Sequence, residues 1–260
     1  MDHATVEGRK LKGEAGSLFV DDGGSGYPTI IFTHSFGGDS SHWIHQLSHL
    51  RSRHRAIAFD FRGHGSSAKP EQLKYTAEAL ANDIVAVADE LDIDKFVLVG
   101  HSMGGSANIA YADSHPQRVL AMVLAGTPGK TPDEISRPVV ASLQSEAYEK
   151  VMKDYMDRLV TDATPRVAEK VSKGVNLLSR ETSTAIIKSL FEFDPIEKLL
   201  RFAGPKLIIS TATELKQPNS LASQVPSLST ELIEGTSHWT QLDKPGEFND
   251  ILDRFLARMV

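Results

Sequence analysis

The chain has 260 residues and no cysteine, and its 34 acidic and 28 basic residues give a formal net charge of −6. Without cysteine the chain has no disulfides, no thiolate metal sites and no cysteine nucleophile. The acidic balance and the lack of a dense basic run disfavour nucleic acid and anionic membranes as partners. The N-terminus is polar, and no apolar stretch approaches the roughly 20 residues that cross a bilayer. We therefore expect a cytoplasmic protein with no membrane partner.

Short apolar runs alternate with amphipathic stretches along the chain. Five runs, at 29–33, 55–59, 95–99, 119–124 and 206–210, are rich in Val, Ile and Phe and predict strands buried on both faces. Weaker edge strands are expected at 16–22 and 228–234. Apolar residues at helical spacing predict helices at 76–91, 106–114 and 245–259. This alternation indicates an α/β fold with a mostly parallel sheet and helices on both faces.

One long segment, 129–203, breaks the alternation. It carries no strand pattern, and its residues predict helices at 138–148, 150–160, 165–178 and 183–191. Because most connections between elements span only about 2–6 residues, this segment is interpreted as an insertion. We expect residues 1–128 and 204–260 to form the core and residues 129–203 to form a helical cap over a ligand cleft.

The strongest chemical signal is Gly100-His101-Ser102-Met103-Gly104, which lies between a predicted strand and a predicted helix. A nucleophilic serine on so sharp a turn needs glycine neighbours, because side chains there would collide with the strand and the helix. The alternative is a glycine-rich turn in which Ser102 only caps the helix. The strand–turn–helix context favours the nucleophile.

A serine hydroxyl needs a base, and the base needs an orienting carboxylate. His238 follows the last predicted strand in a Gly-x-x-His loop, and Glu214 follows the strand at 206–210. The order Ser, acid, His along the chain favours Ser102, Glu214 and His238 as a triad over solvated loop residues. Because His238 must be neutral to act as base, the rate of acyl transfer is expected to rise with pH. Asp243 is interpreted as a surface charge.

An oxyanion would need two N–H donors, and we expect them at Met103 and at Phe36. Ser35, His101 and Trp239 are candidates for the substrate pocket. A further group, His42, His45 and His49, recurs at helical spacing, as a metal-binding face would. No carboxylate motif accompanies these histidines, so a solvated helix face is expected and no metal or other cofactor is predicted.

Together these motifs resemble the α/β-hydrolase fold superfamily, in its serine-nucleophile, esterase-like branch. The resemblance rests on 34–38, 60–66, the turn around Ser102, Glu214 and the loop of His238. It implies an eight-stranded sheet and a helical cap between the sixth and seventh strands. It also implies that the turn at 60–66 buttresses the oxyanion loop. The sequence departs from the family pattern twice, with Ser35 where glycine is usual and Glu214 where aspartate is usual.

The leading functional hypothesis is a serine esterase, an enzyme that cleaves small-molecule carboxylic esters or lactones through an acyl-enzyme on Ser102. The same triad would also serve a C–C bond hydrolase or a cofactor-free perhydrolase or haloperoxidase, because fold and triad do not fix the substrate. A non-enzymatic alternative is a ligand receptor that keeps the pocket, which turnover of esters would distinguish. A monomer or a homodimer is expected.

Overall fold

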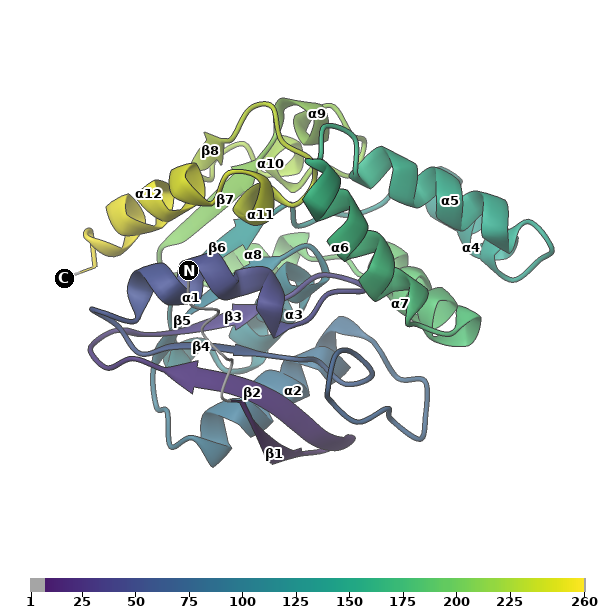
Figure 1. Ribbon diagram of the computed structural model, residues 1–260. Helices are drawn as coiled ribbons and strands as arrows, with labels where there is room; N and C mark the ends of the chain where they lie inside the picture. Colours follow the sequence, from purple (N-terminus) through teal and green to yellow (C-terminus); the bar gives the residue numbers. More distant parts are fainter. Residues whose placement is uncertain (1–7, 260) are drawn as a thin grey trace.

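The computed structural model describes residues 8–259, and an eight-stranded sheet forms its centre (Figure 1). The strand order is β1-β2-β4-β3-β5-β6-β7-β8, with β1, β2 and β4 joined antiparallel and all other neighbours parallel. The predicted α/β class with a mostly parallel sheet is confirmed. The strands are β1 (Arg9–Gly13), β2 (Gly16–Gly23), β3 (Thr29–Thr33), β4 (Ala56–Phe59), β5 (Phe96–His101), β6 (Val119–Ala125), β7 (Lys206–Ser210) and β8 (Thr230–Leu232).

Two hydrophobic cores lie on opposite faces of the sheet, because successive strand residues point to opposite sides. Ile31 and Leu98 pack in one core with residues of α2 (Ala77–Glu90), α3 (Met103–Ser114) and α8 (Ile196–Arg201). Ile30 and Val97 pack in the other with residues of α1 (Ile44–Leu50) and α12 (Pro245–Leu256). Each such side chain contributes about 1.5–3 kcal/mol when fully buried. The central strands are thus rigid supports for the loops at their carboxyl ends.

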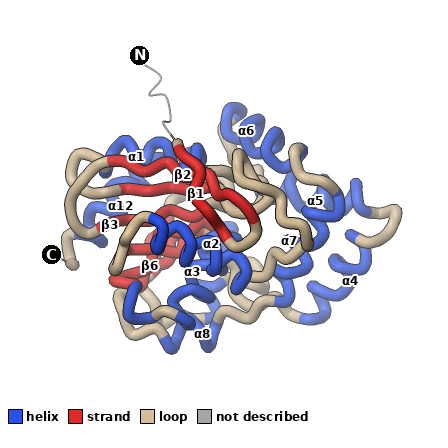
Figure 2. The backbone as a smooth tube through the Cα atoms, turned by 90° about the horizontal axis from the view of Figure 1, so that it is seen from below, coloured by secondary structure: helices blue, strands red, loops and turns tan. Residues whose placement is uncertain are grey.

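Five helices and no strand lie between β6 and β7. They are α4 (Asp133–Leu143), α5 (Tyr148–Leu159), α6 (Pro165–Asn176), α7 (Arg180–Glu192) and α8. Figure 2 shows α4, α5 and α7 gathered at one end of the molecule, beyond the sheet, with α6 beside them. In contrast, α8 packs against α3. The remaining short helices are η1 (Ser40–Trp43), η2 (Pro116–Arg118), α9 (Ala212–Leu215), α10 (Leu221–Gln224) and α11 (Thr240–Asp243).

Strand β1 and helix α4 differ from the sequence prediction, and the short helices α8 to α11 were not predicted. Strand β1 was not predicted, because Leu11 is the one large apolar residue in its five-residue stretch. Helix α4 begins at Asp133, five residues before the predicted start, and Pro138 lies inside it. The prediction began this helix at Pro138, whereas the structure places this proline in the second turn of α4, although proline lacks the N–H that the helix interior uses. None of the helices in residues 8–259 is long and apolar enough to cross a membrane.

Candidate active site

Ser102 lies in a strained turn between β5 and α3. Its backbone adopts φ 52° and ψ −113°, a conformation that non-glycine residues rarely take. The turn is fixed by a hydrogen bond from Ser102 N–H to Ala125 O at 2.8 Å, and 7% of Ser102 remains exposed. Such strain persists where the surrounding structure holds it and is concentrated at functional sites. The elbow predicted around Ser102 is therefore present in the backbone.

The loop after β3 lies directly against this elbow. A Cβ atom added to Gly104 would lie 2.4 Å from Thr33 O and 2.7 Å from His34 O, so only glycine permits the contact. Met103 is the first residue of α3, and its N–H therefore has no acceptor within the helix. The Phe36 N–H, on the loop after β3, donates no hydrogen bond within residues 8–259. The two predicted oxyanion donors thus come from two segments in backbone contact, the start of α3 and the loop after β3.

A buried imidazole braces the loop that carries Phe36. His34 donates from Nδ1 to Ser35 O at 2.8 Å and accepts the Phe61 N–H at Nε2, at 2.9 Å. Burial lowers the pKa of His34, which keeps the ring neutral and able to accept. Asp60 adds a second connection, accepting the Ser40 N–H at 2.7 Å. Through these hydrogen bonds, the turn at 60–66 supports the loop that carries Phe36.

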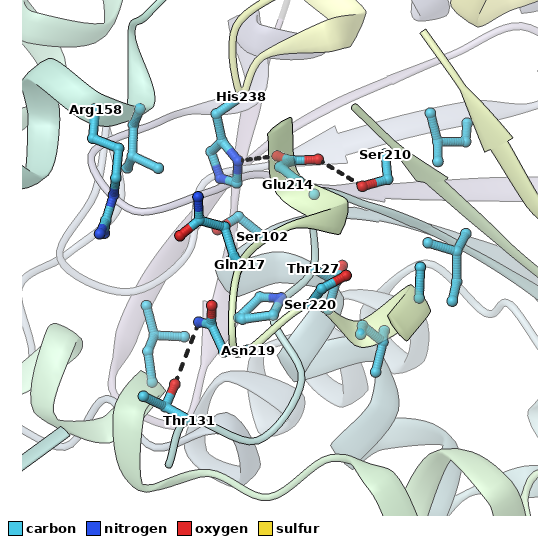
Figure 3. Close-up of a pocket in the computed structure, with 18 of the residues that line it drawn as sticks. Ser102, Thr127, Thr131, Arg158, Ser210, Glu214, Gln217, Asn219, Ser220 and His238 are labelled. Atoms are coloured by element: carbon cyan, nitrogen blue, oxygen red, sulfur yellow. Dashed lines mark hydrogen bonds and ion pairs between the residues drawn. The ribbon is translucent and has the colours of Figure 1, made fainter. Parts of the chain in front are cut away.

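His238 and Glu214 form a short hydrogen bond at the same end of the sheet (Figure 3). His238 Nδ1 donates to Glu214 Oε1 at 2.6 Å, and the two side chains are 10% and 20% exposed. A proton on Nδ1 leaves Nε2 of the neutral ring free to accept. Gly126, with φ 52°, passes close by, and a Cβ there would lie 2.8 Å from His238 Cε1.

Glu214 owes its position to a capping box at the start of α9. Its N–H donates to Thr211 Oγ1 at 3.1 Å, while its Oε2 accepts the Thr211 N–H at 3.0 Å. Oε2 also accepts the Ser210 hydroxyl at 2.9 Å. One carboxylate oxygen is therefore held by the helix start and the other faces His238. The spacing Thr211-x-x-Glu214 is a sequence signature of this cap.

The backbone of His238 is held from both sides. Its N–H donates to Leu159 O, at the end of α5, at 3.1 Å. Its carbonyl accepts Nε2–H of His101 at 2.9 Å, and Gln241 Nε2 donates to Nδ1 of His101 at 3.1 Å. Burial, followed by the neighbouring His238, lowers the pKa of His101 well below its usual range. A neutral His101 can both donate and accept, as this arrangement requires.

Asp243 also holds the histidine loop, which corrects its interpretation as a surface charge. Its Oδ2 accepts the N–H and the hydroxyl of Ser237 at 3.0 and 2.5 Å. Its Oδ1 accepts the N–H of Thr164, the residue that caps α6, at 3.0 Å. The prediction failed because one partner of Asp243, Thr164, belongs to a segment distant along the chain. This carboxylate links the loop of His238 to the turn between α5 and α6.

The candidate active site contains a cavity of about 100 Å³. Ser102, Glu214 and His238 line it together with Tyr155, Arg158 and Leu159 of α5 and with Leu190 and Phe191 of α7. Figure 3 shows the polar side chains that surround Ser102 and His238. Besides those already named, the polar lining residues are Thr127, Thr131, Ser210, Gln217, Asn219 and Ser220. The helices between β6 and β7 therefore form part of the cavity wall, and their contributors were not predicted individually.

The predicted pocket residues Ser35, His101 and Trp239 are not among the described residues that line this cavity. They are 2%, 0% and 1% exposed. Trp239 Nε1 donates to Ser35 Oγ at 3.2 Å, so the hydroxyl that departs from the family pattern binds the loop of His238 to the loop of Phe36. All three residues use their polar atoms on protein neighbours, behind the cavity wall.

The three histidines at helical spacing do not share a solvated face, contrary to expectation. His42 is buried, because it lies in η1 against Gly38, whereas His45 is exposed. His49 Nε2 lies 3.0 Å from Asp253 Oδ2. Among the described residues, no group of three or more potential ligands is placed to hold a metal ion.

Comparison with known proteins defines the class to which this fold and site belong. A family model described as the alpha/beta hydrolase fold matches residues 28–172. The chain therefore belongs to this family, and its activity class is that of a hydrolase.

Among curated proteins, an acetyltransferase component of the acetoin cleaving system of Pseudomonas putida is 28% identical, over 98% of this chain and 69% of that protein. A putative carbamate hydrolase of Caulobacter sp. (strain K31) is 27% identical over 88% and 90%. An enol-lactonase for 3-oxoadipate from Acinetobacter baylyi is 27% identical over 89% of each chain. A solved esterase of Thermogutta terrifontis matches with a TM-score of 0.81 at 22% identity, over 97% of this chain and 99% of that one, which shows the shared fold.

Proposed function

We propose that the chain is a serine hydrolase that cleaves small carboxylic esters or lactones through an acyl-enzyme on Ser102. The observation that carries the proposal is the 2.6 Å hydrogen bond from His238 Nδ1 to Glu214, in the cavity that Ser102 also lines. The relatives named enol-lactonase and putative carbamate hydrolase support the proposal, because hydrolysis of a lactone or of a carbamate begins with attack on a carbonyl carbon. A cavity of about 100 Å³ suits a small acyl group.

Acylation begins when Ser102 Oγ attacks the carbonyl carbon and passes its proton to Nε2 of His238. Glu214 then stabilises the imidazolium through the hydrogen bond at Nδ1. The N–H groups of Phe36 and Met103 donate to the oxyanion as the carbonyl becomes tetrahedral, and each such donor contributes about 10²–10³ in rate. The intermediate collapses when the proton on Nε2 moves to the leaving alkoxide oxygen. The serine ester remains and the alcohol leaves.

Deacylation repeats these steps with water as the nucleophile. His238 Nε2 takes a proton from the water molecule while the oxygen of that water attacks the acyl carbon. As the second tetrahedral intermediate collapses, the bond from the acyl carbon to Ser102 Oγ breaks and the proton on His238 Nε2 moves to Ser102 Oγ. The carboxylic acid then leaves. For a lactone substrate, the alcohol and the acid are parts of one product.

In this proposal α4 to α7 act as a cap that limits access to Ser102. Among the described residues the core then comprises 8–128 and 204–259, with the cap inside 129–203, while residues 1–7 and 260 of the predicted core lie outside the described part of the chain. Tyr155 and Phe191 support this division, because both belong to the inserted helices and both line the cavity. A cap that covers the site excludes water and selects substrates by shape.

Turnover of short para-nitrophenyl esters tests the proposal. The wild type is expected to release many equivalents of para-nitrophenol per chain, and Ser102→Ala to lower kcat by at least about 10⁴-fold. Ser114→Ala, at the exposed end of the same helix, is the matched control and should retain activity. Esterase activity that persists in Ser102→Ala, or a folded wild type without turnover, would contradict the proposal.

A further inference from the structure

Arg158 is the one lysine or arginine among the described residues that line the candidate active-site cavity. It lies in the last turn of α5, next to Leu159, whose carbonyl accepts the His238 N–H. The end of α5 is therefore fixed relative to the proposed base. In Figure 3, Arg158 and Glu214 lie on opposite sides of the His238 ring.

Among the described residues, the guanidinium of Arg158 has no partner of opposite charge. Within residues 8–259 its side chain makes no ion pair and no hydrogen bond, although three acids, Glu149, Asp154 and Asp157, lie on the same helix. Asp154 pairs with Lys150, and Asp157 pairs with Lys153. The guanidinium carbon lies instead 5.4 Å from the centre of the Tyr155 ring, which favours an orientation over that ring. All five N–H donors thus stay available to a ligand.

The rest of the cavity would not repel an anion. Glu214 is its one acidic lining residue among those described, and both of its oxygens already accept hydrogen bonds. Apart from His238 and Arg158, the other polar lining side chains are uncharged amides and hydroxyls, among them those of Gln217, Asn219 and Thr131. Since a guanidinium can bind a carboxylate through two parallel hydrogen bonds, a carboxylate is the ligand group that matches Arg158 best.

We propose that Arg158 is the carboxylate-binding residue of the active site, which makes the substrate an ester or lactone that carries a carboxylate away from the bond being cleaved. This inference rests on the proposed serine hydrolase function. Arg158 stays exposed at the opening of the cavity. The bound carboxylate therefore lies at the entrance, with the scissile carbonyl further in at Ser102.

Two matched substrate pairs test the inference. Mono-para-nitrophenyl adipate and its methyl ester compare a charged with a neutral acyl group, and meta-acetoxybenzoate and its methyl ester do so for the leaving group. In at least one pair, Arg158→Gln should lower kcat/KM for the anionic member by about 10- to 100-fold and change the neutral member far less. Arg158→Lys, which keeps the charge but not the two-pronged geometry, should fall between. Because exposed charges are screened, added salt should weaken the wild-type preference.

Arg166→Gln is the matched control, since Arg166 is an exposed arginine on α6 that does not line the cavity. It removes the same charge from the same set of helices and should leave the preference intact. If Arg158→Gln affects both members of both pairs equally, the carboxylate site is overturned while the hydrolase proposal stands.

If no ester is cleaved, the proposed function fails and the site is judged by binding alone. Adipate is then titrated into the wild type by calorimetry. Binding that is lost in Arg158→Gln and kept in Arg166→Gln supports the site, and the absence of such binding overturns it.

Discussion

Glu214 performs two tasks that a shorter acid could not combine. Its Oε2 closes the capping box on Thr211, and its Oε1 accepts from His238. As the third residue of α9, it reaches back to the helix start and across to the histidine loop at once. The extra methylene, a departure from the family pattern, follows from this geometry.

The first prediction concerns the charge of Glu214. Glu214→Gln keeps the shape of the side chain but removes the anion that stabilises the imidazolium. In steady-state kinetics with a short ester, kcat is expected to fall by about 10³- to 10⁴-fold. Little change in KM is expected, because both carboxylate oxygens already accept hydrogen bonds from the protein. Glu234→Gln, at an exposed position before the histidine loop, should behave as wild type. A kcat for Glu214→Gln within threefold of wild type would contradict the assignment.

At the scale of elements, the segment between α5 and α6 is joined to the loop of His238. One connection runs from His238 N–H to Leu159 O, and the other runs through Asp243 to Thr164 N–H. Because both bonds reach the ends of inserted helices, the position of the proposed base depends on how these helices are placed.

The second prediction addresses this connection. Asp243→Asn replaces one of the two accepting carboxylate oxygens with an N–H₂ group. This group would face the N–H or hydroxyl donors of Ser237 or Thr164 and repel them, so the loop of His238 should be held less firmly. We expect kcat for a short ester to fall about 10-fold, with KM nearly unchanged and the thermal midpoint lowered, because bonds to a charged acceptor contribute about 1.5–3 kcal/mol. Asp250→Asn, on the exposed face of α12, serves as the control. If Asp243→Asn and Asp250→Asn have equal kinetics and equal thermal midpoints, Asp243 does not position the loop of His238.

The strands that carry the site were predictable, because their pattern is local. The runs at 29–33 and 206–210 match β3 and β7 residue for residue, and the turn of Ser102 follows a strand as predicted. The roles of Asp243 and Arg158 were not predictable. Asp243 binds Thr164 of a distant segment, and no periodicity reports which loop meets which helix. The place of Arg158 in the cavity wall likewise depends on how α5 packs in the folded chain. The burial of His42 was hidden for the same reason.

The molecule as a whole keeps several histidines uncharged in its interior. Burial lowers the pKa of His42 and of His64 to about 3 and lowers that of His101 well below its usual range. In an unfolded chain an imidazole titrates near about 6.5. Between these values the unfolded chain binds more protons than the folded one. The contribution of these buried, neutral histidines to the free energy of unfolding is therefore fully present above about pH 6.5 and declines as the pH falls toward about 3.

The third prediction follows from this loss of stability at acidic pH. The free energy of unfolding, measured in urea from about pH 8 to about pH 5, should be flat above neutrality and fall below it. Each buried histidine adds up to about 1.4 kcal/mol per pH unit. Asp60, whose pKa is raised by burial, opposes the trend at the acidic end. His64→Gln should make the slope shallower, and an unchanged slope in that variant would count against a neutral His64.

The central claim, an activated Ser102 hydroxyl, is tested most directly by the mass of the chain after treatment with a fluorophosphonate. The account predicts one adduct per chain, located on the peptide that contains Ser102 and absent from Ser102→Ala. It also predicts much slower labelling of His238→Gln, which lacks the base. A folded wild type that gains no adduct, or an adduct that persists in Ser102→Ala, would contradict it.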